Sequence, residues 1–233
     1  MMDWKTVATR LFDGGHDIAA SGDLLSGNGR CGETTFAVIG STNHAEIGAE
    51  LALAMAKQVI ATIRDHPRRP VLFLIDTQGQ RLRHRDELLG IHRYMGHLAL
   101  CVELARSRGH RIVALVYDQA LSGGFLATGM MADRCAALPD AEIRVMNLPA
   151  MARVTRLPEE RLRSLAQTSP VFAPGAVNYV AMGAIDALWD GDLAAELRAA
   201  LAEAPRSDTR RDVGEARGGR KLAATISRRA AAE

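Results

Sequence analysis

The sequence predicts an α/β fold in which parallel strands are joined by helices, and three observations lead to this prediction. Two unbroken apolar runs, at residues 71–75 and 112–117, are typical of strands that are buried on both faces. A long amphipathic helical pattern precedes each run, and a short helical pattern follows the second. Strands and helices that alternate in this way form parallel sheets with right-handed crossovers.

Length and composition are those of an ordinary globular protein. The chain has 233 residues, 48% of them apolar and 24% charged, which suits one large domain or two small ones. Its net charge of +2 gives no electrostatic reason to expect nucleic acid as a partner.

The cysteines and the N-terminal segment indicate the cellular compartment of the protein. Cys31, Cys101 and Cys135 are far apart and form no CxxC pair, which argues against a disulfide framework or a zinc site and fits a reducing cytoplasm. The first residues lack the apolar segment of a signal peptide, and no stretch approaches the ~18 apolar residues of a membrane span. We therefore expect a cytoplasmic protein without a membrane partner.

The first third of the chain predicts a helix, a hairpin and a second helix. Residues 1–12 carry apolar side chains at helical spacing, and residues 13–34 are rich in turn-forming types. Residues 31–39 contain the first clear strand. A helix follows, because apolar residues recur there every four positions, namely Ile47, Leu51, Met55, Val59 and Ile63. Pro67 and Pro70 end this pattern.

The middle of the chain repeats the alternation. The apolar run at 71–75 leads into a polar segment, 76–80, which is expected to be a loop. Helical spacing resumes at Leu88 and continues to Ala105, and Gly109 ends it. The second apolar run, 112–117, then leads into another polar segment, 118–124, and a short helix at 125–132.

The remaining residues predict smaller elements and a tail. Short strands are expected at 134–138 and 142–146, helices at 147–155, 158–167, 177–182 and 193–202, and a short strand after 183–186. We assign residues 1–204 to one domain. Residues 205–233 hold eight Arg or Lys against four Asp or Glu and few apolar residues, so they form either a mobile tail or an arm that docks on a partner.

The most informative segment is the junction at 118–124, where Gly123 and Gly124 lie between a buried strand and a helix. Glycines let a backbone approach a ligand closely, and the first N–H groups of a helix lack partners inside it. The pair therefore forms either an oxyanion hole or a plain tight turn. Segments 76–80 and 118–124 both follow parallel strands, so we expect them to meet at one edge of the sheet, where such sheets bind ligands.

Other reactive side chains leave alternatives open. Ser122 is either a nucleophile, if a histidine reaches it, or a turn or cap residue. Asp76 and Asp118 are each either a base or a turn residue. The basic cluster at 81–85 is either a solvated helix start or a contact for phosphate or carboxylate. The sequence has no HExxH, Walker lysine or GxGxxG motif, so we expect neither a metal nor a nucleotide.

Longer motifs carry a specific resemblance. The run YDQALSGGFLATGMMADRCAALPDAEIRVMNLPAMARVT at 117–155 closely resembles the gamma subunit of biotin-independent malonate decarboxylase. So do GHDIAASGDLLSG at 15–27, the run at 72–99 and the run at 169–189, and together these cover most of residues 11–190. More distantly, IDTQGQ and ALSGGF are similar to the glycine loops of acyl-CoA carboxyltransferases.

The resemblance implies a fold, a reaction and partners. The fold would be crotonase-like, a superhelix of stacked ββα units of the type found in the C-terminal half of acyl-CoA carboxyltransferases. With a beta subunit, such a chain would decarboxylate malonyl-S-acyl carrier protein to acetyl-S-acyl carrier protein, and an acyl carrier protein transferase subunit would reload the carrier. No biotin, metal or other cofactor would be held by this chain, because the phosphopantetheine-type arm of the carrier presents the substrate.

The resemblance also implies which residues act. The catalytic set would be Gly123, Gly124, Gly79, Gln78 and Ser122, with backbone amides facing either the thioester oxygen or the departing carboxylate. Two other functions remain open: a serine hydrolase of the same fold that uses Ser122, and a scaffold half whose partner holds all the chemistry.

Overall fold

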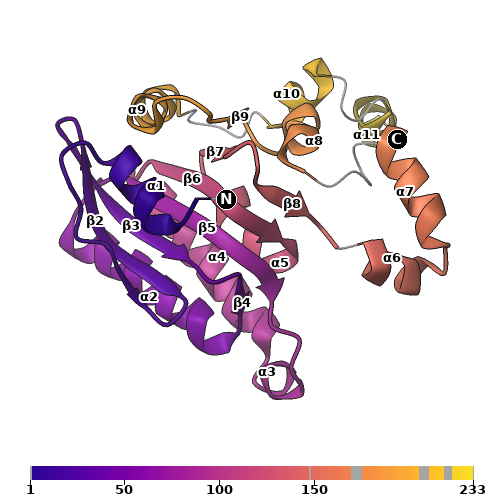
Figure 1. Ribbon diagram of the computed structural model, residues 1–233, viewed down its shortest axis with the longest axis horizontal. Helices are drawn as coiled ribbons and strands as arrows, with labels where there is room; N and C mark the ends of the chain where they lie inside the picture. Colours follow the sequence, from indigo (N-terminus) through magenta and orange to yellow (C-terminus); the bar gives the residue numbers. More distant parts are fainter. Residues whose placement is uncertain (1, 147, 169–174, 205–209, 218–221, 233) are drawn as a thin grey trace.

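The computed structural model describes residues 2–146, 148–168, 175–204, 210–217 and 222–232. Within these ranges nine strands form one sheet (Figure 1). The strands are β1 (Ala19–Ser21), β2 (Leu24–Cys31), β3 (Thr34–Ser41), β4 (Ala45–Ile47), β5 (Val71–Gln80), β6 (Ile112–Leu121), β7 (Arg134–Ala137), β8 (Glu142–Arg144) and β9 (Ala187–Leu188). The helices are α1 (Trp4–Leu11), α2 (Ala49–Asp65), α3 (His84–Leu88), α4 (Ile91–Ser107), α5 (Ser122–Leu126), α6 (Leu148–Thr155), α7 (Glu159–Thr168), α8 (Ala176–Ala181), α9 (Leu193–Glu203), α10 (Arg210–Ala216) and α11 (Ala223–Ala231), with a 3₁₀ turn at Gly129–Met131.

The sheet is parallel in its centre and antiparallel where its first three strands pair. The strand order is β1-β2-β3-β5-β6-β7-β9, and the first two pairings are antiparallel while the others are parallel. β4 adds to the end of β5 and β8 adds to the end of β6, both in parallel. The α/β class predicted from the sequence is therefore confirmed.

The central strand β6 is buried on both faces, as its apolar run predicted. Its residues Ile112, Ala114 and Val116 face a core shared with α2 and α4. Val113, Leu115 and Tyr117 face a second core shared with α1 and α9. Successive side chains of a strand point to opposite faces, so an uninterrupted apolar run is what two helical layers require.

The structure corrects three predicted boundaries. The strand expected at 31–39 is divided by a turn, since β2 ends at Cys31 and β3 begins at Thr34. Ile47, counted in the helical pattern, belongs to β4, which the sequence analysis missed. The polar segments 76–80 and 118–121, expected as loops, are strand, because β4 and β8 pair with them and satisfy their backbone groups.

The order β3-β4-α2 and the order β7-β8-α6 each place two strands before a helix. These are the ββα units that the resemblance implied. In both units the short second strand extends the sheet at the carboxyl end of a longer neighbour, so it adds to the edge where ligands are expected.

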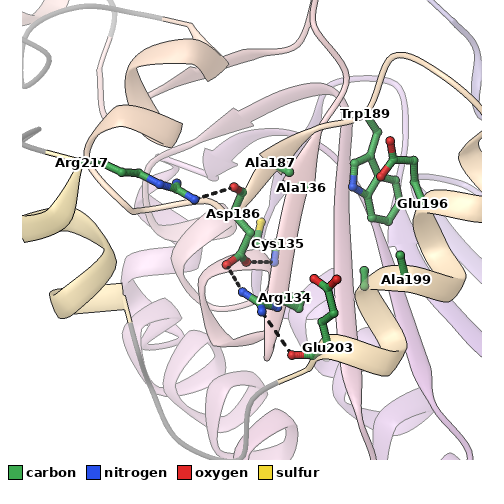
Figure 2. A pocket seen from close by; sticks show the side chains of 11 residues that line it. Arg134, Cys135, Ala136, Asp186, Ala187, Trp189, Glu196, Ala199, Glu203 and Arg217 are labelled. Carbon is green, nitrogen blue, oxygen red and sulfur yellow. Dashed lines mark hydrogen bonds and ion pairs between the residues drawn. The ribbon is translucent and has the colours of Figure 1, made fainter.

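The C-terminal arm, α10 and α11, contacts the body through Arg217. Its guanidinium donates to the carbonyl oxygens of Val180, Ile185 and Asp186 at 2.7, 3.1 and 3.0 Å. Figure 2 shows the contact of Arg217 with Asp186 beside a cavity of about 280 Å³ that lies between the start of β7 and α9. Residues 205–209, 218–221 and 233 lie outside the described ranges, and the division at residue 204 stays a prediction. None of the described helices is long and apolar enough to cross a membrane.

Arg217→Ala is expected to speed hydrogen exchange in α10 by on the order of tenfold, because it removes charge-assisted hydrogen bonds that join the arm to the body. Exchange mass spectrometry of the full chain measures this directly. Arg228→Ala is the matched control, since its ion pair with Glu215 at 3.0 Å lies within the arm and is exposed. Equal exchange rates in the two variants would contradict the prediction.

Candidate active site

The carboxyl ends of β5 and β6 bring the two glycine segments together. These strands are parallel neighbours, and a register shift precedes the pairing of Thr77 with Ala120. A Cβ atom on Gly79 would lie 3.0 Å from the carbonyl oxygen of Leu121 and 3.0 Å from Cβ of Ser122. The expectation that the two segments meet at one edge of the sheet is therefore confirmed.

Side chains of the same edge already hold two of the glycine amides. The N–H of Gly123 donates to Oε1 of Gln80 at 3.0 Å. The N–H of Gly79 donates to Oγ1 of Thr77 at 2.9 Å, and this hydroxyl donates in turn to the carbonyl oxygen of Ala45 at 2.6 Å. Thr77 is fully buried whereas Gln80 is only half-buried, so the amide of Gly123 is the one that a ligand oxygen can reach by displacing a side chain.

Gly124 and Ser122 differ from what was expected of them. The φ angle of Gly124 is not positive, and a Cβ atom there would lie 3.0 Å from Cδ1 of Ile47 and from Oγ1 of Thr77. Gly124 thus packs closely against β4 and β5, and no acceptor within the described ranges takes its N–H. Ser122 has a φ of +51°, a left-handed conformation that costs a non-glycine residue on the order of 1 kcal/mol.

The side chain of Ser122 has no partner of the kind a nucleophile needs. Helix α5 has no side-chain cap, so Ser122 is not the capping residue that was one alternative. Within the described part of the chain, no hydrogen bond joins its Oγ to a histidine. Gln78, the glutamine chosen from the motif, is exposed, and the glutamine that reaches Gly123 is Gln80 two residues later.

The basic cluster at 81–85 is partly neutralised by neighbouring acids. Nε of Arg81 lies 3.8 Å from Oε2 of Glu46, and a nitrogen of Arg85 lies 2.5 Å from Oε1 of Glu50. These pairs favour the solvated helix start over a contact for phosphate.

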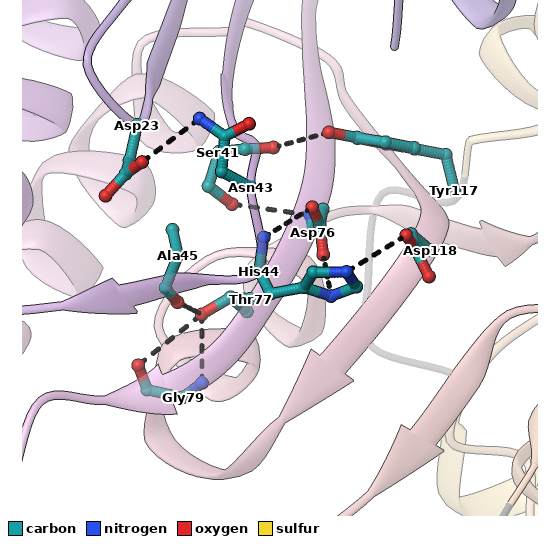
Figure 3. A network of polar contacts seen from close by, with 10 residues as sticks. All are labelled: Asp23, Ser41, Asn43, His44, Ala45, Asp76, Thr77, Gly79, Tyr117 and Asp118. Carbon is teal, nitrogen blue, oxygen red and sulfur yellow. Dashed lines mark hydrogen bonds and ion pairs between the residues drawn. The ribbon is translucent and has the colours of Figure 1, made fainter. Parts of the chain in front are cut away.

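A second polar cluster lies at the same edge and consists of His44, Asp76 and Asp118 (Figure 3). Nδ1 of His44 lies 3.3 Å from Oδ1 of Asp76, and Nε2 lies 3.7 Å from Oδ2 of Asp118. The other carboxylate oxygen of Asp76 accepts the backbone N–H of His44 at 2.8 Å. Asn43 and His44 have φ angles of +60° and +50°, so two consecutive left-handed residues turn the chain toward the cluster.

Burial dominates the electrostatics of this cluster. It raises the pKa of Asp76, with the His44 backbone N–H and ring opposing and the Asp118 carboxylate adding to the rise. Burial also raises the pKa of Asp118, and the ring of His44 opposes it. The neighbouring Tyr117 is buried too, which raises its pKa, and its hydroxyl donates to the carbonyl oxygen of Ser41 at 3.0 Å.

Both aspartates were candidates from the sequence, whereas His44 was not. The alternatives for the aspartates were a base or a turn residue, and both in fact lie inside strands, next to one another in the sheet. The signal for His44 was its place just beyond the carboxyl end of β3, the parallel neighbour of β5, where it joins the same edge.

Structural relatives define the class of protein. The chain matches one chain of a Pseudomonas malonate decarboxylase hetero-tetramer in complex with coenzyme A with a TM-score of 0.76 and 25% identity, over 94% of this chain and 95% of that chain. It matches transcarboxylase 12S, with hydrolysed methylmalonyl-coenzyme A bound, with a TM-score of 0.71 and 19% identity, over 85% and 40% of the two chains. With the ββα units, these matches define a crotonase-like fold of the carboxyltransferase type.

The sequence relatives are more specific. Residues 42–233 match the family of the malonate decarboxylase gamma subunit, and the chain belongs to this family. A curated relative, the malonyl-S-ACP:biotin-protein carboxyltransferase MADD of Malonomonas rubra, is 36% identical over an alignment of 151 residues that covers 61% of this chain. The chain spans about half of that relative, 52% of its length. The resemblance is therefore confirmed, and the family match continues through the C-terminal arm.

Proposed function

We propose that this chain pairs with a carboxyltransferase-like beta subunit and that the pair decarboxylates a malonyl thioester, carried by an acyl carrier protein, to the acetyl thioester. The family match over residues 42–233 carries this proposal. The carrier-bound malonyl group in the name of the Malonomonas relative and the hetero-tetramer of the Pseudomonas relative support its two parts.

The reaction needs a place for developing negative charge. When the bond between C2 and the carboxyl carbon breaks, its electron pair becomes an enolate whose charge rests on the thioester oxygen, CO₂ leaves, and C2 then takes a proton. A backbone donor aimed at that oxygen lowers the barrier by ~3 kcal/mol in known oxyanion holes. Gly123 is the donor we assign to this role, because the side chain that now accepts its N–H is only half-buried.

Gly124 and Gly79 have supporting roles in this proposal. The amide of Gly124 adjoins that of Gly123 and can serve as the second donor, whereas the amide of Gly79 is held by buried Thr77 and fixes the shape of the strand end. If the amides face the departing carboxylate instead of the thioester oxygen, the same donors stabilise its charge in the bound substrate.

The experiment is to purify the chain with its beta subunit and supply malonyl-S-acyl carrier protein. Mass spectrometry of the carrier is expected to show loss of CO₂ and formation of the acetyl thioester. A carrier that keeps its malonyl group, or that is hydrolysed to free malonate and thiol, would contradict the proposed function.

Ser122→Ala is expected to keep the turnover of the complex within about threefold of wild type, because the hydroxyl caps no helix and has no histidine partner within the described residues. The kcat of carrier decarboxylation measures this. A folded complex that loses activity more than a hundredfold, together with covalent labelling of Ser122 by a fluorophosphonate, would favour a serine hydrolase.

A further inference from the structure

His44, Asp76 and Asp118 form a cluster that the proposed decarboxylation does not use. One nitrogen of His44 and one oxygen of each aspartate lie within 4.8 Å of one another. The three residues come from the end of β3 and from the strands β5 and β6, so the fold, and no local motif, brings them together. Both aspartates are at least nine-tenths buried.

Two atoms of the cluster lack the hydrogen bonds that buried polar atoms normally make. Nδ1 of His44 and Oδ1 of Asp76 are inaccessible to solvent, and neither has a hydrogen-bond partner within the described ranges. They face each other at 3.3 Å. Two ligands bound at ~2.1 Å to one tetrahedral cation lie ~3.4 Å apart, so this separation suits a shared ion.

The surroundings fix the carboxylate of Asp76 with its free oxygen toward the cluster. Its Oδ2 accepts the backbone N–H of His44 at 2.8 Å, which leaves Oδ1 directed toward the His44 ring. Among the described residues, no lysine or arginine makes an ion pair with either aspartate of the cluster. Two buried carboxylates therefore lie within reach of one imidazole ring, a set of oxygen and nitrogen ligands that a divalent cation would bind.

We infer that this cluster binds one divalent first-row transition cation, of the Mn²⁺ or Zn²⁺ class, through one nitrogen of His44 and one oxygen each of Asp76 and Asp118. Water would complete the coordination, because the His44 side chain is 37% exposed and leaves a path from solvent. An imidazole with two carboxylates suits Mn²⁺ or Zn²⁺, whereas Mg²⁺ prefers oxygen ligands. Short sequence motifs predicted no metal here, because ligands from separate strands do not form such motifs.

The test is isothermal titration of the full-length chain, freed of metal by chelator, with Mn²⁺, Zn²⁺ and Mg²⁺. We expect one saturable site per chain for Mn²⁺ and Zn²⁺, with at least tenfold weaker binding of Mg²⁺. Saturating Mn²⁺ is expected to raise the Tm by about 5 °C and to broaden the imidazole NMR signals of His44 before those of the other histidines.

His44→Gln and Asp118→Asn are each expected to weaken Mn²⁺ binding at least tenfold. Asp133→Asn is the matched control, since this half-buried aspartate accepts the N–H of Ile112 at the opposite edge of the sheet, and its Mn²⁺ affinity should equal that of wild type. Two results would overturn the inference: no saturable binding below 1 mM Mn²⁺ or Zn²⁺, or unchanged affinity in both cluster variants. Because binding is measured without substrate, the outcome is independent of the proposed decarboxylase activity.

Discussion

Gly79→Val is expected to lower the turnover of the decarboxylase complex by about 10²-fold or more. Gly79 has a φ of +99°, which L side chains rarely adopt, and its Cβ would lie 3.0 Å from the backbone of Leu121 and from Ser122. The valine must push away the segment that leads into Gly123. Loss of one correctly placed oxyanion donor costs about 10²–10³ in kcat, and the strain adds about 1–3 kcal/mol of lost stability.

The measurement is the kcat of carrier decarboxylation, with complex formation followed by size-exclusion chromatography. Gly191→Val is the control, because no atom lies within 4 Å of its Cβ position and its φ is outside the left-handed region. Gly79→Ala provides a milder variant if valine prevents assembly. A Gly79→Val complex that assembles and turns over at the wild-type rate would show that the glycine segments take no part in the chemistry, and the chain would then be a scaffold for its partner.

The isolated chain is expected to show no decarboxylation above background, and the beta subunit is expected to restore it. Exposed apolar side chains occur on the segments that follow the carboxyl ends of β5, β6 and β8, at the same edge as the glycines; they are Leu82, Leu88, Leu126, Val145 and Val154. A partner packed there would bury apolar surface and exclude water from the site. Full activity of the single chain would contradict this prediction.

Substitutions at two exposed leucines test whether the beta subunit binds at this edge or elsewhere on the surface. Leu88 on α3 and Leu100 on α4 are exposed to nearly the same extent, 74% and 70%. Leu88→Asp is expected to weaken assembly with the beta subunit at least tenfold, and Leu100→Asp, on the helical layer, is expected to leave it unchanged. Surface plasmon resonance between the two subunits compares them directly, and equal affinities would place the interface elsewhere.

The strands and long helices could be predicted from sequence because each depends on a local pattern. The runs at 71–75 and 112–117 and the apolar spacing in α2 and α4 specify burial without knowledge of their partners. Strand ends could not be predicted in this way. Asp76 to Gln80 are polar, and they continue β5 because β4, more than thirty residues earlier, supplies the pairing.

In the candidate site, too, the residues that belong to local motifs could be predicted from sequence and the others could not. The glycines were identified from their local motif, and the contact between Gly79 and the Ser122 segment followed from the rule for strand ends. Gln78 and Gln80 would face the same side of a regular strand. The register shift between the pairs Ala45–Thr77 and Glu46–Gly79 breaks this alternation at Gln78, and the sequence does not show such a shift. His44 could not be identified because its importance depends on two aspartates in other strands.

The hydrogen bond between Gln80 and Gly123 also affects how binding energy is divided between the bound substrate and the transition state. An empty site with a bare buried amide would lose about 1–3 kcal/mol, and the glutamine oxygen avoids that loss. When a thioester oxygen takes its place, one neutral acceptor is exchanged for another, so this contact adds little to ground-state affinity. As the oxygen gains negative charge the bond becomes roughly twice as strong. In the donor role proposed here, the hydrogen bond from Gly123 therefore stabilises the transition state far more than the bound substrate. Such a contact raises kcat without lowering KM.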